Sequence, residues 1–277
     1  MSTWLLDRKC VERMSWLFSD LPEEKRLMIK MNEVAFFSVT PAVFADKVAK
    51  MMRTMVAFLG KPPYAVIDGT ACVGGDTRLL AKHFDMTVAI EKDPETYALL
   101  RDNLTTWGVD AKTISGDTAA LIPQFWTLIG AVATFSLYLD PPWGGVEYRS
   151  QKDIQLTLGS LAVEDVVNRA FEAHLSMKLA VLKLPRNYNC GYLFRKLGKH
   201  EVFRITQGNF FVFFVARRGS RVKEHGRTAL LQLRQARNEA EAKKNGGATE
   251  GEETNGDEEV KEGGEAEKND EAKEGAE

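Results

Sequence analysis

The 277-residue sequence has few of the residues that build disulfide frameworks and metal centres. Its three cysteines, Cys10, Cys72 and Cys190, lie far apart without a CxxC pair, and its four histidines stand singly. Neither a disulfide framework nor a metal site is therefore indicated, and we expect a reducing compartment. No apolar run approaches the roughly 20 residues needed to cross a bilayer, and charges at residues 7 to 9 come too early for a secretory signal. We expect a soluble intracellular protein without a membrane partner.

The chain also has little net charge, −2 in total, but this value hides an uneven distribution. Residues 245–277 contain thirteen Asp or Glu and three Lys, a net of −10, which leaves +8 on residues 1–244. A basic body suits an anionic partner such as RNA, although lysine-rich surfaces also serve solubility. The acidic tail has almost no large apolar side chain, so we expect it to be disordered.

Short β-rich runs alternate with helical runs from residue 63 onward, which predicts a mostly parallel α/β sheet of the Rossmann-like type. The last two strands are joined by TQGN, which predicts a terminal antiparallel hairpin. We expect a domain at 63–219, preceded by a small N-terminal helical extension or lid at 1–62 and followed by a charged helix at 220–244 and the tail at 245–277. The predicted strands are 64–68, 87–91, 111–114, 132–139, 179–184, 200–205 and 209–218, and the predicted helices of the domain are 76–84, 94–108, 117–126 and 163–175.

One helix is predicted near the end of the extension. Thr40 is suited to cap it, and Pro41 is suited to its first turn. Apolar residues then recur at helical spacing, and we expect them to pack into the core. They are Phe44, Val48, Met51, Met52 and Met55.

The segment VIDGTACVGGDT, residues 66–77, follows a predicted strand and opens a helix. Its glycines permit a sharp turn and a close approach to a ligand, but it lacks the GK[ST] ending of a phosphate loop and does not match GxGxxG. It is similar to the first motif of class I S-adenosylmethionine-dependent methyltransferases. In that motif a strand-end acid, here Asp68, and a glycine turn hold the amino-acid part of the cofactor. The resemblance assigns Gly69, Thr70, Gly74 and Thr77 to the same turn.

Acids also follow the next two predicted strands. Glu91 lies 23 residues after Asp68, where the ribose hydroxyls are expected, and Asp117 follows the third strand, where it can bond the adenine amino group. One such acid alone is more often a helix cap or a surface charge. Three acids at successive strand ends indicate a cofactor site.

The run YLDPPWGGVEY, residues 138–148, follows the fourth predicted strand. It resembles the [DNS]PP[YFW] motif of enzymes that methylate exocyclic amines of bases. Asp140, which we also count among the cofactor-binding residues, and the Pro141 carbonyl can accept the two N–H bonds of the amine. The prolines stiffen this turn, and Trp143 offers a face for base stacking. A turn with a buried tryptophan is the structural alternative.

Four ordered segments resemble those of trimethylguanosine synthases, which methylate N2 of the 7-methylguanosine cap of small nuclear and nucleolar RNAs. FFSVTP (36–41) resembles WFSVTPE, VIDGTACVGGDT resembles DAFCGVGGNT, DPPWGGVEY resembles SPPWGGPDY, and KLPRN (183–187) resembles FLPRN. The resemblance covers about residues 15–218. It implies a nuclear monomer that acts on 7-methylguanosine-capped RNA, with ribonucleoprotein proteins as partners.

The same resemblance implies roles for individual residues. Trp143 would stack on 7-methylguanine, and the cap side would also hold Ser38, Arg186 and Asn187, with Arg186 toward the triphosphate. The residues that it places against S-adenosylmethionine are Thr40, Asp68, Glu91 and Asp117.

Three departures from the family pattern keep alternatives open. Gly69-Thr70 replaces alanine-phenylalanine, Glu91 replaces the usual aspartate, and Asp140 replaces serine. DPPW is also the signature of RNA adenine-N6 methyltransferases, so adenine in RNA or DNA is an alternative target. FSVTP and the glycines after Trp143 favour the cap. A non-catalytic RNA-binding subunit would need a broken cofactor site, whereas the acids and glycines of that site are present.

Overall fold

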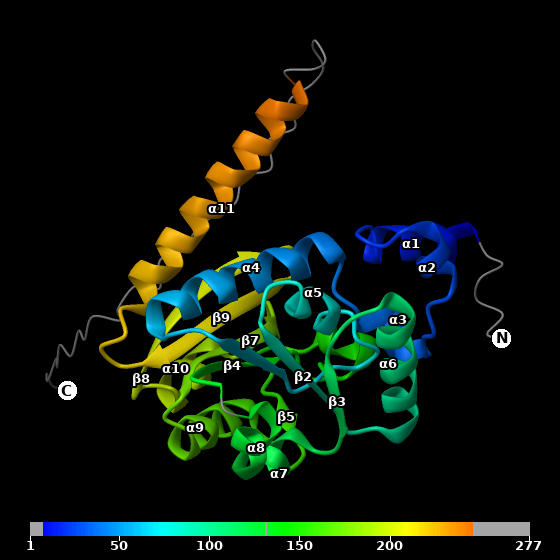
Figure 1. The fold of residues 1–277 in the computed structure, drawn as a ribbon. Helices are drawn as coiled ribbons and strands as arrows, with labels where there is room; N and C mark the ends of the chain where they lie inside the picture. The colour runs from blue at the N-terminus through cyan, green and yellow to red at the C-terminus, as the bar shows by residue number, and fades with distance from the viewer. Residues whose placement is uncertain (1–7, 131, 246–277) are drawn as a thin grey trace, which may run out of the picture.

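A seven-stranded sheet forms the centre of the computed structural model, which describes residues 8–130 and 132–245 (Figure 1). The strand order is β3-β2-β1-β4-β7-β9-β8, in which β9 pairs antiparallel with β7 and β8 and the other neighbours pair in parallel. The predicted parallel sheet with a terminal antiparallel hairpin is confirmed. The strands of this sheet are β1 (Tyr64–Asp68), β2 (Met86–Glu91), β3 (Lys112–Ser115), β4 (Thr134–Leu139), β7 (Met177–Pro185), β8 (His200–Gln207) and β9 (Phe210–Arg217), and β5 (Thr157–Leu158) pairs separately with β6 (Leu161–Ala162).

Burial explains the composition of the strands. Every residue of β1 and β4 is buried, as expected for central strands covered on both faces, and both are nearly continuous apolar runs. The edge strand β3 has no fully buried residue. The sheet therefore has its most protected strands, β1 and β4, side by side at its centre.

Helices cover both faces of the sheet (Figure 1). The predicted helix at 117–126 is wrong as one element: Pro123 has no N–H to continue an α-helix, and a 3-10 turn separates two short helices there. One face carries α4 (Ala42–Leu59), α5 (Thr77–Ala81), α6 (Pro94–Trp107) and α11 (Val222–Asn245); the other carries α7 (Thr118–Leu121), η2 (Ile122–Gln124), α8 (Phe125–Ile129), α9 (Val163–Ala173) and α10 (Cys190–Lys196).

The methionine stripe of α4 packs into the core as predicted, where Met51, Met52 and Met55 are fully buried. The predicted cap at Thr40 is wrong, because the cap position is Pro41 and makes no side-chain capping bond. The Thr40 hydroxyl instead bonds to side chains at the sheet edge described below. The long helix α11 begins against α4 and β8, and its C-terminal half extends away from the body (Figure 1).

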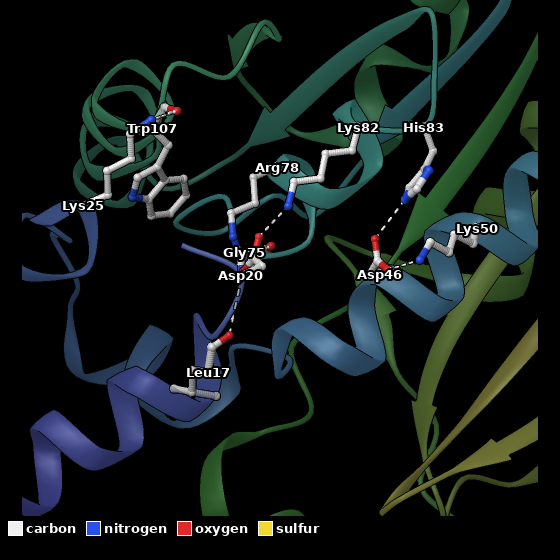
Figure 2. Close-up of polar contacts among 10 residues, drawn as sticks. All are labelled: Leu17, Asp20, Lys25, Asp46, Lys50, Gly75, Arg78, Lys82, His83 and Trp107. Carbon is white, nitrogen blue, oxygen red and sulfur yellow. Dashed lines mark hydrogen bonds and ion pairs between the residues drawn. The ribbon is translucent and has the colours of Figure 1, made fainter. Parts of the chain in front are cut away.

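Three short helices precede α4: α1 (Arg8–Leu17), α2 (Glu23–Leu27) and α3 (Glu33–Ser38). The buried Arg78 of α5 connects them to the rest of the protein (Figure 2). Its guanidinium donates to Asp20 Oδ1 at 2.7 Å, to the Leu17 carbonyl at 3.5 Å and to the Gly75 carbonyl. The end of α1 and the turn after it are thus attached to the glycine turn, while the role of these helices as a lid stays a prediction.

Three further sequence expectations concern the acidic tail, a membrane span and a metal site. The acidic tail, apart from Asn245 at the end of α11, lies outside the described residues. Within the described ranges, no helix has both the length and the apolar character needed to span a membrane. In the same ranges, no group of three His, Cys, Asp or Glu side chains is arranged to hold a metal ion.

Candidate active site

The predicted acids meet at one edge of the sheet, formed by the carboxyl ends of its parallel strands. Asp68 ends β1, Glu91 ends the neighbouring β2, and Asp117 lies two residues beyond β3. Asp140 follows β4 and Arg186 follows β7, on the other side of β1. Ligands of open α/β folds bind at this edge, so the fold gathers these side chains where the sequence places a site.

Asp68 is a buried carboxylate, 1% exposed, with neutral partners. The Thr77 hydroxyl donates to it at 2.6 Å and the Thr70 backbone N–H at 3.2 Å. Burial raises the pKa of Asp68 to about 7, helped by the nearby Asp76 and opposed by the hydrogen bond from Thr77. No described lysine or arginine forms an ion pair with Asp68. Such a carboxylate favours a cationic ligand.

The glycine turn after β1 is closely packed against the site. A Cβ on Gly69 would lie 2.7 Å from a methyl group of Leu139 and 2.8 Å from that of Thr118, so any larger residue would have to displace these side chains. Cys72 adopts φ of +49°, an uncommon conformation for a non-glycine residue, and its N–H donates to Glu91 Oε2 at 2.9 Å. Glu91 therefore fixes the turn as well as ending β2.

Thr70 and Asp117 have clear structural bonds. The Thr70 hydroxyl accepts the Asp140 N–H at 2.7 Å and so joins the two motifs, which gives a physical role to one departure from the family pattern. Asp117 caps α7 by accepting the Ala119 N–H at 2.9 Å and pairs with Lys92 at 2.8 Å. The hydrogen bond from Lys92 lowers the pKa of Asp117. The adenine contact assigned to Asp117 stays a prediction beside this capping role.

The DPPW segment begins with a second buried carboxylate. The Asp140 side chain is 16% exposed, and its Oδ2 accepts from Lys183 Nζ at 2.5 Å. Burial raises the pKa of Asp140, and Lys183 opposes the shift. Pro141 is buried and Trp143 is half-buried, with its ring edge-to-face on Tyr148 at 5.2 Å between centroids. An anion and an indole therefore stand together at the end of β4.

Lys183 is a site residue that the sequence analysis missed. It lies on β7, its side chain is 4% exposed, and its ammonium also donates to the Thr40 hydroxyl at 2.6 Å. Burial lowers its pKa, but Asp140 and Asp76 outweigh burial and raise it, so Lys183 stays cationic. A lysine within the apolar run LAVLKL was the available signal, because central strands rarely bury an unpaired lysine.

Two further missed residues extend this cluster. Asp76 Oδ2 accepts from the Thr40 hydroxyl at 3.2 Å and from the Tyr138 hydroxyl at 2.9 Å. Its other oxygen is buried without a hydrogen-bond partner among the described residues. The carboxylates of Asp68, Asp76 and Asp140 thus outnumber the single ammonium of Lys183. This excess of negative charge fits a ligand that brings cationic and hydrogen-bond-donating groups.

The predicted cap-side residues flank this cluster. Ser38 is exposed at the end of α3, where its hydroxyl donates to the Val34 carbonyl at 2.8 Å, and Arg186 is exposed just after β7. The Asn187 amide donates to the carbonyls of Tyr148 and Gln151 at 2.6 and 2.8 Å. It thereby holds the 3-10 helix η3 (Gly145–Ser150), which carries the Tyr148 ring that Trp143 contacts. Contact of these residues with a cap stays a prediction.

Comparison with known proteins gives matches of different extent. A relative from Acanthamoeba polyphaga mimivirus, an uncharacterized protein, is 28% identical over 137 residues, 50% of this chain and 52% of that protein. The chain thus matches about half the length of this relative. The human methyltransferase 10 domain containing protein has 13% identity and a TM-score of 0.48, covering 77% of this chain and 99% of its own. A hypothetical protein of Thermus thermophilus has 16% identity and a TM-score of 0.45, covering 68% and 92%.

A family model provides the decisive match. The model described as RNA cap guanine-N2 methyltransferase matches residues 64–230, which is more than half of the chain. The match includes the glycine turn, the DPPW segment and KLPRN, three of the four segments that carry the predicted resemblance, and it confirms that resemblance. With the sheet order and the strand-end acids described above, it establishes a class I methyltransferase fold. The chain belongs to the RNA cap guanine-N2 methyltransferase family.

Proposed function

We propose that the protein transfers methyl groups from S-adenosylmethionine to N2 of guanosine in the 7-methylguanosine cap of small RNAs, toward the 2,2,7-trimethylguanosine cap. The observation that carries the proposal is the position of the Asp140 to Trp143 segment at the end of β4, beside Asp68 at the end of β1. Family membership supports methyl transfer in general. The cap guanosine as acceptor is the further step proposed.

The acids at the sheet edge fit the cofactor by charge. S-adenosylmethionine supplies a methyl group on a positively charged sulfur and carries a cationic amino group. Asp68, which is buried with neutral partners only, accepts the amino-acid part, next to the glycine turn and Thr40. Glu91 and Asp117 stand at the next two strand ends, in the order expected for ribose and adenine.

The DPPW segment fits an acceptor that is a poor nucleophile. The lone pair of an exocyclic amine is delocalised into the base, so its nitrogen needs orientation more than a strong base. Asp140 and the Pro141 carbonyl accept the two N–H bonds and direct the nitrogen toward the methyl carbon. S-adenosylmethionine held here would supply the methyl group, with its carbon–sulfur bond broken as the nitrogen–carbon bond forms, and Asp140 would take the one proton that the nitrogen loses. Positioning and electrostatics supply most of the catalysis in this arrangement.

Trp143 fits recognition of a methylated cap. Guanine methylated at N7 is a cation, and an indole face attracts a cation more strongly than a neutral base. Base stacking on an aromatic ring contributes about 1–3 kcal/mol. Arg186 is exposed just after β7, which supports its proposed contact with the triphosphate, and Ser38 and Asn187 are proposed to contact the cap as well.

Methyl transfer from labelled S-adenosylmethionine tests the proposal. The acceptors are 7-methylguanosine-capped RNA, the same RNA with an unmethylated cap, and an uncapped adenine-rich oligomer. We expect label on N2 of the methylated cap alone. Label on adenine would instead support adenine-N6 methylation, the candidate that Asp140 favours because DPPW is its signature. No transfer and no cofactor binding would support an RNA-binding subunit.

The cellular setting is a further part of the proposal and rests on the family resemblance. We propose a nuclear, monomeric protein that acts with ribonucleoprotein proteins. Imaging of the tagged full chain tests the location, and sedimentation equilibrium tests the monomer. A cytoplasmic protein or a stable dimer would contradict these two parts without affecting the chemistry.

A further inference from the structure

The burial of Lys183 is unfavourable in free energy, because a charged side chain is removed from water. Its strand, β7, lies between β4 and β9, and the side chain is 4% exposed. An ion taken from water into a protein interior costs several kcal/mol unless partners compensate it. Leucine or phenylalanine at this position would avoid that cost. The lysine therefore needs a reason beyond packing.

The contacts of the ammonium join the DPPW segment to Thr40. It bonds to Asp140 Oδ2 at 2.5 Å and to the Thr40 hydroxyl at 2.6 Å. It also lies 5.2 Å from the Trp143 ring centroid and 5.1 Å from that of Phe210. Lys183 thus connects the acid and the indole of the DPPW segment.

We infer that Lys183 is a positioning residue for methyl transfer, whose ammonium holds Oδ2 of Asp140 so that Oδ1 faces the acceptor amine beside Trp143. This inference rests on the proposed function, because it assigns Asp140 as the acceptor of an amine N–H bond. Thr40 completes the arrangement, since its hydroxyl accepts from Lys183 and donates to Asp76. One cation on β7 thereby links the residue after β4, the segment before α4 and the turn before α5.

A cation serves here better than a neutral donor because of the surrounding charges. Two carboxylates, Asp76 before α5 and Asp68 on β1, lie near Asp140 and disfavour a further anion at that position. Without Lys183, Asp140 would take up a proton more readily, and a protonated carboxyl group loses acceptor capacity for the amine. The phenols of Tyr138 on β4 and Tyr148 in η3 also face this pair.

The family motifs have uncharged residues at both of these positions. SPPW has serine where this chain has Asp140, and FLPRN has phenylalanine where it has Lys183. The two departures touch each other, so the charged pair replaces an uncharged pair. Exchanging both residues should therefore remove a buried ion pair without leaving a buried charge alone.

Four variants test the inference, with kcat and KM for 7-methylguanosine-capped RNA measured between pH 6 and 9.5. We expect Lys183→Met to lower kcat at pH 7 by about a hundredfold, with recovery at high pH as Asp140 ionises. Asp140→Ser alone should lose as much. The double variant Asp140→Ser/Lys183→Phe should return to within about tenfold of wild type. Lys178→Met is the matched control. It removes a lysine on the same strand whose ammonium bonds at the protein surface, and it should leave kcat unchanged.

Cofactor binding and thermal unfolding of each variant separate this role from misfolding. The inference would be overturned if Lys183→Met had the kcat of wild type. It would also be overturned if this variant had a lowered kcat but kcat fell at low pH over the same pH range as in wild type. If this variant is unstable, the double variant carries the test. The double variant lacks Asp140, so its kcat should no longer fall at low pH. A fall of kcat at low pH that persisted in this variant would overturn the inference. Wild-type protein without cap methylation would overturn the proposed function and this inference together.

Discussion

The ends of β1 and β4 show two ways of burying an aspartate at one sheet edge. These strands are hydrogen-bonded neighbours, with Asp68 paired in register to Tyr138, two residues before Asp140. Burial raises the pKa of both carboxyl groups. Asp140 has the Lys183 ammonium at 2.5 Å, whereas the bonds to Asp68 come from the Thr77 hydroxyl and the Thr70 N–H.

This difference matches two different tasks. A carboxylate with its own internal cation keeps its charge and can orient a neutral amine, which brings no positive charge of its own. A buried carboxylate with only neutral partners destabilises the free protein. A cationic ligand relieves this destabilisation when it binds, and the relief adds to the affinity for that ligand. On this account Asp68 obtains its cationic partner only when the cofactor binds, whereas Asp140 has its cationic partner, Lys183, in the free protein.

Replacing Asp68 should give the largest effect on ligand binding. Asp68→Asn keeps the shape of the side chain but removes its charge, and we expect the affinity for S-adenosylmethionine to fall about a thousandfold, as for loss of one partner of a buried ion pair. Isothermal titration measures this loss. A variant that binds within tenfold of wild type would break the comparison, because Asp68 would then hold no cationic group.

The same variant should gain stability when no cofactor is present. The pKa of Asp68 is about 7 in the folded protein against 3.8 for an ordinary aspartate, so the folded state binds the proton more tightly. This group therefore loses stabilising effect as pH rises from about 4 to 7 and is most costly above pH 7. Asp68→Asn should raise Tm of the ligand-free protein at pH 8 and change it little at pH 4. A lower Tm at pH 8 would contradict the account.

Replacing Asp140 should have the opposite effect on stability. Asp140→Ser leaves the Lys183 ammonium buried without its anionic partner, which should lower the free energy of unfolding by about 3 kcal/mol. Denaturant unfolding at pH 7 measures the change. The double variant with Lys183→Phe should recover most of it. A single variant as stable as wild type would show that this ion pair carries no structural role.

Removing the Thr40 hydroxyl tests the hydrogen-bonded link between Lys183 and Asp76. Thr40→Val deletes the bonds to Lys183 and Asp76 and should cost about 1 kcal/mol of stability. Thr40→Ser, which keeps the hydroxyl, is the control. Equal stability of the two variants in denaturant unfolding would remove Thr40 from the network.

The smallest effect is expected at Asp117, which combines a cap with a surface ion pair. Asp117→Ser keeps a capping oxygen and removes the pair with Lys92, so stability should change by less than about 0.5 kcal/mol. Cofactor affinity should fall only a few-fold, because the proposed contact of Asp117 with adenine is a single hydrogen bond. An unchanged affinity would assign Asp117 to the helix cap alone.

Much of the fold could be predicted because its signals are local. The strand at 64–68 is matched residue for residue, and the methionine stripe of α4 is buried as its spacing indicates. The broken helix at 117–126 contained its own signal in Pro123. Thr40 shows the limit of local signals, since a hydroxyl before a helix is a typical cap, yet here it bonds to Lys183, 143 residues away.

The site was predictable where motifs mark strand ends, and less so where residues act across strands. Asp68, Glu91 and Asp140 follow from the order of strands and turns. Lys183 and Asp76 required knowledge of which side chains from distant segments meet. The lysine had a signal of its own, a charge inside an apolar strand, but its partner could not be read from the sequence.

Proton release on cofactor binding tests the central claim most directly. Titration of S-adenosylmethionine into wild-type protein and Asp68→Asn at pH 6.5, in two buffers of different ionisation enthalpy, counts the protons. With a pKa of about 7, Asp68 is largely protonated at that pH and loses its proton when a cationic ligand binds. We predict a release of about half a proton or more by wild type beyond that of the variant. Equal proton counts for the two proteins, with affinity retained in both, would contradict the account.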